Sequence, residues 1–265
     1  MVSERGAGLG RTPAACFRDE LRDFFHFVVH PRLGPRLPGR HAGSGWWEDW
    51  FPALSVGRLL KWAFFLWSVN LVFLGPIAVA AATAGGATHR LNIHNIPWMA
   101  ALVWAPIVEE LVFRYGLRRV GAIWWLVPAA VAAMLMGATW SGILLLAGIL
   151  LVCWMPYLAN IPYARKPIPW RYRLGYRRLF PWVFHAASLL FAAVHLYNFT
   201  LQAGTPWWLF PLLVLPQWLT GLVLGWLRVK RGIGASMLLH GMFNGGPLLV
   251  VWLVIQWAPD MAGAL

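Results

Sequence analysis

Apolar segments long enough to cross a bilayer are the feature that most restricts the fold of this 265-residue chain. A membrane-crossing helix needs about 20 mostly apolar residues. Backbone polar groups in lipid must be satisfied internally, so such segments form helices. The sequence therefore predicts an all-α, polytopic transmembrane helix bundle of about seven spans. These spans lie near residues 60–84, 96–116, 120–137, 139–159, 180–202, 206–227 and 234–257.

The composition agrees with a membrane protein. Hydrophobic residues make up 60% of the chain and charged residues only 12%, whereas soluble domains carry about 25% charge. The third and fourth spans form one long apolar stretch, which we divide at GATWSG (137–142). A single long, tilted helix is the alternative there.

The positions of the basic residues predict the orientation. All but Arg90 and Arg114 of the 22 Lys and Arg residues lie in four groups, at 1–61, 118–119, 165–178 and 228–231. Seven spans put all four groups on one side, which the positive-inside rule makes the cytoplasm. The N-terminus is therefore expected to be cytoplasmic. Because the excess charge sits in short loops between spans, we expect the lipid bilayer, and no nucleic acid, as its partner.

Residues 1–58 are predicted to form a cytoplasmic or interfacial segment that precedes a transmembrane domain at 59–257. Within this segment, FRDELRDFFHFVVH (17–30) has the pattern of an interfacial amphipathic helix. PRLGPRLPGR (31–40) has the composition of a linker, and WWEDWF (46–51) that of an aromatic anchor. The apolar face of the helix is expected to contain Phe17, Leu21, Phe24, Phe25, Val28 and Val29.

Two adjacent glutamates and an arginine interrupt one apolar segment, in PIVEELVFRYGL (106–117). A charge at the middle of a membrane helix costs roughly 2.5–3.5 kcal/mol on insertion scales, so these residues are candidates for function. Glu110 and Arg114 are four apart and can form an ion pair. Glu109 is turned by about 100° from Glu110, so it can face a cavity. The alternative is a structural Glu–Arg pair that holds helices together.

Two further motifs place polar side chains inside later spans: FAAVH (191–195) and HGMFN (240–244). His240 and Asn244 are four apart on one helical face, and both can donate hydrogen bonds to an oxyanion. Each motif alone is equally compatible with hydrogen bonds between helices. Together with a carboxylate base and His195, however, they complete a set of groups suited to hydrolysing an amide bond.

These motifs, in this order, resemble the CPBP family, also called the CAAX protease and bacteriocin-processing or Abi family. It includes the eukaryotic CAAX prenyl endopeptidase (Ras-converting enzyme). The family shows EExxxR, FxxxH and HxxxN, which appear here as EELVFR (109–114), FAAVH and HGMFN. The resemblance implies an intramembrane endopeptidase in which Glu109 activates water and His195 orients it. It also implies that His240 and Asn244 stabilise the oxyanion, while Glu110 and Arg114 support the geometry of the site.

The resemblance leaves the need for a metal open. We favour a metal-free mechanism that requires no cofactor, because no HExxH motif is present. Zinc is the alternative, and its ligands would be Glu109, His195 and His240, which are suitable residue types. The expected substrate is a membrane-associated peptide or protein. Nothing in the sequence selects a prenylated one.

The chain departs from the family pattern in two places. An additional helical hairpin and a basic loop, at about 120–178, separate EELVFR from FAAVH. Tyr115 follows Arg114 where the family often has Gly, and we expect it to narrow the site. At about 1.5 Å per residue, His195 lies about 25 Å along its helix from Arg178. That helix is therefore expected to start well outside the bilayer.

Two other functions fit the same helices. One is a non-catalytic immunity or partner-binding protein, which the basic N-terminal segment and the additional hairpin would suit. The other is a proton-coupled transporter, which is less favoured because no paired discontinuous helices are visible. The Gly-, Ala- and Arg-rich composition favours the inner membrane of a bacterium.

Overall fold

The computed structural model describes residues 16–34, 47–51, 54–91, 95–158 and 169–257. These residues are helical apart from turns, loops and two short strands, β1 (Thr88–His89) and β2 (Phe199–Thr200), which pair antiparallel. The prediction of an all-α protein is confirmed. Several predictions fall outside the described residues: the first 15 residues, most of the linker at 31–40, the start of the basic loop at 164–178, and the C-terminal end at 258–265.

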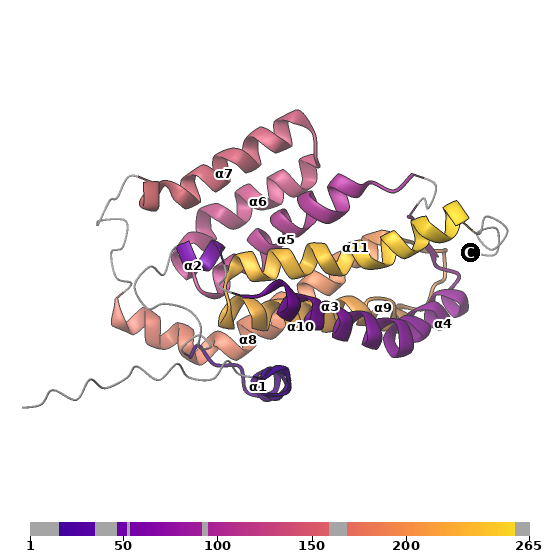
Figure 1. Ribbon diagram of the computed structural model, residues 1–265, viewed down its shortest axis with the longest axis horizontal. Helices are drawn as coiled ribbons and strands as arrows, with labels where there is room; N and C mark the ends of the chain where they lie inside the picture. Colours follow the sequence, from indigo (N-terminus) through magenta and orange to yellow (C-terminus); the bar gives the residue numbers. More distant parts are fainter. Residues whose placement is uncertain (1–15, 35–46, 52–53, 92–94, 159–168, 258–265) are drawn as a thin grey trace, which may run out of the picture.

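Long helices lie side by side and form the body of the molecule (Figure 1). Helix α11 contacts α3, α5 and α10, while α8 packs on α10. Helices α6 and α7 form a hairpin on the outer side of α5. Helix α1 lies against the bundle with its axis across the long helices, so Figure 1 shows it end-on. The helices are α1 (Phe17–Val29), α2 (Trp47–Trp50), α3 (Val56–Val69), α4 (Gly75–Gly85), α5 (Ala105–Phe113), α6 (Ile123–Met136), α7 (Trp140–Leu158), α8 (Trp170–Val194), α9 (Phe210–Leu213), α10 (Leu215–Lys230) and α11 (Ile233–Trp257).

Among the described residues, three helical segments are long and apolar enough to cross a membrane: Val56–Gly85, Trp170–Asn198 and Ile233–Trp257. A bent pair, Trp207–Leu213 with Leu215–Lys230, is a fourth candidate, with 49° between its halves. These segments correspond to four of the seven predicted spans. The chain is an integral membrane protein by this measure. The number of seven spans remains a prediction, because α6 and α7 are shorter and the helix that contains α5 runs only over 98–113. The cytoplasmic N-terminus also remains a prediction.

Proline explains where two of these segments change geometry. The π-helical segments Asn70–Leu74 and Ala100–Trp104 each end two residues before a proline, Pro76 and Pro106. Proline has no N–H, so the carbonyl of the preceding turn loses its donor, and π segments commonly form at such positions. The break between α6 and α7 has another cause, Gly137 with φ of 66°. The predicted third and fourth spans are therefore a hairpin and not one long helix.

Among the described residues, two of the three hydrophobic clusters join the helices that carry the motifs. In the first, Trp62, Trp226 and Phe184 join α3, α10 and α8, and α1 adds Phe24. In the second, Leu111 and Leu126 join α5 to α6, and residues of α7 complete it. The polar groups of the three motifs lie on α5, the C-terminal end of α8 and α11, so these two clusters position the site.

Helix α1 packs on the bundle by a face that differs in part from the predicted one. Glu20, Phe24 and Phe27 are buried, whereas Phe25 and Val29 are 56% and 70% exposed. Of the six apolar side chains predicted to share one face, Phe17, Leu21, Phe24 and Val28 pack against the bundle, whereas Phe25 and Val29 do not. The buried face contacts Trp62 and Trp226, and two apolar side chains of α1 stay outside.

The length of α8 accounts for the depth of His195. The helix has 25 residues and starts at Trp170, so it is about 37 Å long at 1.5 Å per residue. This exceeds the bilayer core, which is about 30 Å thick. A start outside the bilayer, as the sequence predicts, is consistent with this length.

Candidate active site

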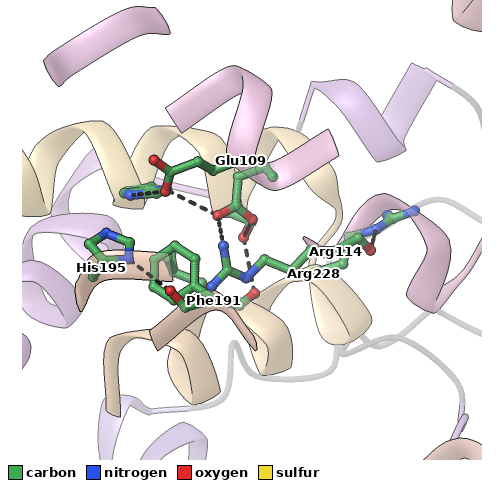
Figure 2. Close-up of polar contacts among 9 residues, drawn as sticks. Glu109, Arg114, Phe191, His195 and Arg228 are labelled. Carbon is green, nitrogen blue, oxygen red and sulfur yellow. Dashed lines mark hydrogen bonds and ion pairs between the residues drawn. The ribbon is translucent and has the colours of Figure 1, made fainter. Parts of the chain in front are cut away.

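The three motifs meet in the interior of the bundle (Figure 2). Glu109 and Glu110 lie on α5, and Arg114 is its C-terminal cap residue. His195 is the C-terminal cap residue of α8, and His240 and Asn244 lie on α11. Contacts between side chains link all of these residues except Asn244, which contacts the π segment that precedes α5.

Glu110 is the centre of the hydrogen-bond network. It is fully buried and accepts hydrogen bonds from Arg114 Nη1 at 2.5 Å, from His240 Nδ1 at 3.0 Å and from the Ser236 hydroxyl. The ion pair that the sequence predicts is therefore present. A carboxylate only accepts, so His240 carries a hydrogen on Nδ1, and Nε2 of the neutral ring is an acceptor.

Glu109 differs from its neighbour because one of its oxygens has no partner. Its Oε2 is buried and has no hydrogen-bond partner among the described residues. The nearest ionic group is His240 Nε2 at 3.7 Å, which is too far for a hydrogen bond. One carboxylate of the pair is thus neutralised by an arginine, while the other retains lone pairs that can accept a hydrogen bond from a water molecule.

The phenylalanine of FAAVH is the packing platform of the site. Phe191 is fully buried, and the Arg114 guanidinium lies 3.8 Å from its ring centre. The rings of His195 and His240 lie 4.6 and 5.6 Å away, centre to centre. His195 Nδ1 donates to the Phe191 carbonyl at 2.7 Å, so the neutral His195 ring also has its acceptor on Nε2. Phe191 therefore fixes one cation and two imidazoles relative to each other.

Asn244 and Gly241 join α11 to the π segment before α5. Asn244 Nδ2 donates a hydrogen bond to the Ala101 carbonyl at 2.9 Å. In the π segment this carbonyl would accept from the residue five positions later, but that residue is Pro106, which has no N–H. A Cβ atom on Gly241 would lie 2.8 Å from the Leu102 carbonyl oxygen, so only glycine fits at this approach. The HGMFN motif thus supplies the hydrogen-bond donor that Pro106 cannot supply, and Gly241 of the same motif allows the two helices to approach closely.

Sequence reasoning missed one residue of the site and assigned another to the wrong place. Ser236, fully buried, lies between the Glu110 carboxylate and the Leu224 carbonyl. It precedes His240 by four residues, so helical periodicity places both on one face and could have revealed it. Tyr115 packs in the second hydrophobic cluster, against Trp50. The expectation that it narrows the site is therefore wrong.

The donor types would suit zinc, but their arrangement does not. His195 and His240 both present an acceptor Nε2, and Glu109 has a free carboxylate oxygen. Among the residues that the structure describes, however, no three His, Cys, Asp or Glu side chains lie close enough to hold one ion. Catalytic zinc sites normally use three protein ligands. We therefore derive no step through a metal.

The fold and site define a helical membrane protein in which a carboxylate–imidazole cluster is assembled from three sequence motifs. Comparison with family models identifies it further: the type II CAAX prenyl endopeptidase Rce1-like family matches residues 92–246. This is more than half of the chain and contains all three motifs, so the chain belongs to this family of membrane proteases. No match is found among curated proteins or among solved structures.

Proposed function

We propose that the chain is an intramembrane endopeptidase that hydrolyses a peptide bond of a membrane-associated polypeptide, within a seven-span bundle whose N-terminus is cytoplasmic. The observation that carries this proposal is the unpartnered Oε2 of Glu109, buried 3.7 Å from an acceptor nitrogen of His240. Two acceptors at this spacing suit one water molecule, which can donate a hydrogen to each. The pair can thus hold and polarise a nucleophile.

The reaction follows from these positions. Glu109 takes a proton from the water, whose oxygen attacks the carbonyl carbon of the substrate and forms a tetrahedral oxyanion. The C–N bond then breaks, and the proton on Glu109 passes to the leaving nitrogen. Glu109 is thereby restored as a carboxylate, and the products are a carboxylic acid and an amine. Proton transfer of this kind contributes typically about 10²–10⁴-fold to the rate.

The surrounding groups take supporting roles. Glu110 holds His240 through Nδ1, and Arg114 neutralises the Glu110 carboxylate. His195, whose Nε2 is also an acceptor, is the alternative to His240 for the second hydrogen of the water, because a water molecule donates only two. Asn244 has two N–H hydrogens, and one of them is used on the Ala101 carbonyl. The second can donate to the oxyanion, whereas His240 can do so only after Nε2 has gained a hydrogen.

A library of quenched fluorogenic peptides, offered to the protein in liposomes, tests this function. We expect Glu109→Gln to lower kcat by about 10²–10⁴-fold, and His195→Ala to lower it as well. His185→Ala is the matched control, because His185 lies on the same helix outside the site and should leave the rate unchanged. Full activity of Glu109→Gln would overturn the proposal. A wild-type protein that binds peptides without cleaving them would favour the partner-binding alternative.

A further inference from the structure

A cavity of about 430 Å³ lies beside His195, between α4, the β1–β2 pair and the start of α10. Its volume is in the range of small-ligand pockets, about 300–1,000 Å³. One wall consists of small residues of α4, among them Gly75, Ala78 and Ala82. Because these side chains are short, the cavity is wide enough for a chain segment next to the imidazole.

Four of the polar side chains that line this cavity each have at least one polar atom that no hydrogen bond among the described residues uses. His89, Asn198 and Gln217 line it together with His195. Among the described residues, no hydrogen bond joins the side chains of Asn198 or Gln217 to another group. Polar groups of this kind, on an otherwise apolar lining, typically orient a bound ligand.

The strand pair positions His89. Its partner across the sheet is Phe199, and the two rings lie edge to face with centres 5.2 Å apart. The backbone N–H of Leu91 donates to His89 Nδ1 at 3.0 Å, so Nδ1 has no hydrogen and the neutral ring carries it on Nε2. Burial lowers the pKa of His89 below its ordinary value, and the neighbouring His195 lowers it further. His89 is thereby a neutral ring with a fixed donor.

The two imidazoles of the cavity have opposite roles. His89 offers an N–H, whereas His195 offers an acceptor Nε2 because its Nδ1 is bonded to the Phe191 carbonyl. The acceptor of His195 is reserved for the water, whereas a peptide carbonyl can accept from the His89 N–H, so this donor is complementary to a polypeptide backbone. This argument rests on the proposed function, since it supplies a substrate-binding surface for the same site.

We infer that the cavity binds the backbone of the substrate next to the scissile bond, and that His89 Nε2–H donates to a substrate carbonyl. His89 is then a substrate-binding residue, and it takes no part in the proton transfers at Glu109. Its contact with the substrate is the same before and during the reaction, so losing it weakens binding and leaves the chemical step intact.

The test uses the peptide that the wild-type protein in liposomes cleaves best. His89→Ala should raise KM about three- to tenfold, the worth of one hydrogen bond, with kcat unchanged. His89→Gln keeps an N–H donor of similar reach and should restore much of the loss. Thr88→Ala is the matched control, because adjacent strand residues point to opposite faces, and its KM should equal that of the wild type.

The outcomes separate the two proposals. If the wild-type protein cleaves and Glu109→Gln does not, the proposed function stands. An unchanged KM for His89→Ala, or a fall in kcat alone, then overturns the role of His89. If the wild-type protein cleaves no peptide, both proposals fail. A KM raised equally by Thr88→Ala would mean that the strand pair, and not the His89 donor, is responsible, which also overturns the inference.

Discussion

Two buried ionic clusters in this molecule use the same residue types and differ in their charge balance. The site contains two carboxylates and one arginine, which pairs with Glu110, and Oε2 of Glu109 has no hydrogen-bond partner among the described residues. In the other cluster, which we call the clasp, every acid has a cation of its own, and two acids have a second one: Arg58 lies 3.7 Å from Glu20, and Arg119 lies 3.8 Å from Asp49. The clasp consists of Glu20, Asp23 and Asp49 with Arg231, Lys230 and Arg228.

The clasp ties the N-terminal segment to the turn between α10 and α11. Glu20 also accepts a hydrogen bond from Trp62 Nε1 at 3.1 Å, and Asp23 accepts one from Trp226 Nε1 at 2.8 Å. The acids lie outside the matched residues 92–246, whereas the cations of the turn lie inside. No Asp or Glu occurs between Glu110 and Asp260, so the cations of the turn draw their partners from the earlier part of the chain.

The comparison leads us to predict that the surplus carboxylate is reactive and that the paired ones are structural. A buried charge that loses its partner costs about 3–5 kcal/mol, so the clasp should contribute stability and no chemistry. The surplus carboxylate, Glu109, should contribute chemistry and little stability. Substitutions in the two clusters can break this distinction or sharpen it.

Glu110→Gln should have the largest effect, because Arg114 then remains buried without a counter-charge. We expect the free energy of unfolding to fall by about 3–5 kcal/mol, and activity to be lost with the His240 contact. Thermal unfolding in detergent measures the change in stability. Glu109→Gln is the matched control on the same helix, with a smaller stability loss expected because its Oε2 has no hydrogen-bond partner. Equal losses for both variants would remove the distinction between the two glutamates.

Arg228→Met tests the clasp, and its effect should be next in size. Arg228 donates to Asp49 at 2.6 Å and to the carbonyls of Arg114 and Tyr115, both at 3.2 Å. We expect a loss of about 3 kcal/mol, at the low end for a broken buried pair, because Arg119 stays 3.8 Å from Asp49. Adding Asp49→Asn removes the carboxylate that has lost Arg228, and this should recover part of the lost free energy of unfolding. A kcat that collapses in the folded variant would show that the clasp takes part in the chemistry.

These two clusters also show what can be predicted from sequence. EELVFR is local: its residues are four apart at most, so helical geometry alone predicts that Glu110 pairs with Arg114 and that Glu109 turns away. The clasp joins residues 20–49 to residues 228–231, and no local period connects positions so far apart. Glu20 and Asp23 belong to the polar residues of the amphipathic pattern at 17–30, and only tertiary packing buries Glu20.

The fold follows the same rule. Composition and the spacing of apolar segments predict a helical membrane protein, because these depend on the bilayer and not on particular contacts. The edge of the α1 face that packs inward could not be predicted, since Phe27, outside the predicted face, is buried, whereas Phe25, within it, is exposed. Within the site, the identity of the three motifs was readable, but their hydrogen bonds were not. That Asn244 donates to Ala101 depends on a carbonyl freed by Pro106 on another helix.

Gly241→Ala should have a smaller effect, because it moves the site without removing a charge. The new Cβ would lie 2.8 Å from the Leu102 carbonyl oxygen, and overpacking of this kind costs about 1–3 kcal/mol. The shift of α11 should also lower kcat, because His240 moves relative to Glu109. Gly245→Ala is the matched control: its Cβ meets a flexible Leu102 side chain at 3.4 Å. If both variants behave alike, close approach at Gly241 does not position the site.

Removal of metal should have the smallest effect, and it tests whether the unbalanced carboxylate acts by itself. We expect kcat and KM of the liposome-bound protein to stay unchanged after treatment with a zinc chelator. A zinc-dependent hydrolase needs the metal to lower the pKa of its bound water, so it would lose activity and regain it with added zinc. The same Glu109→Gln and His195→Ala variants would be inactive in either case, and the chelator therefore separates two mechanisms that mutagenesis does not. Loss of activity that zinc restores would mean that the surplus charge of Glu109 binds a metal cation. The two clusters would then differ in the kind of cation that each one holds, a metal ion in the site and basic side chains in the clasp.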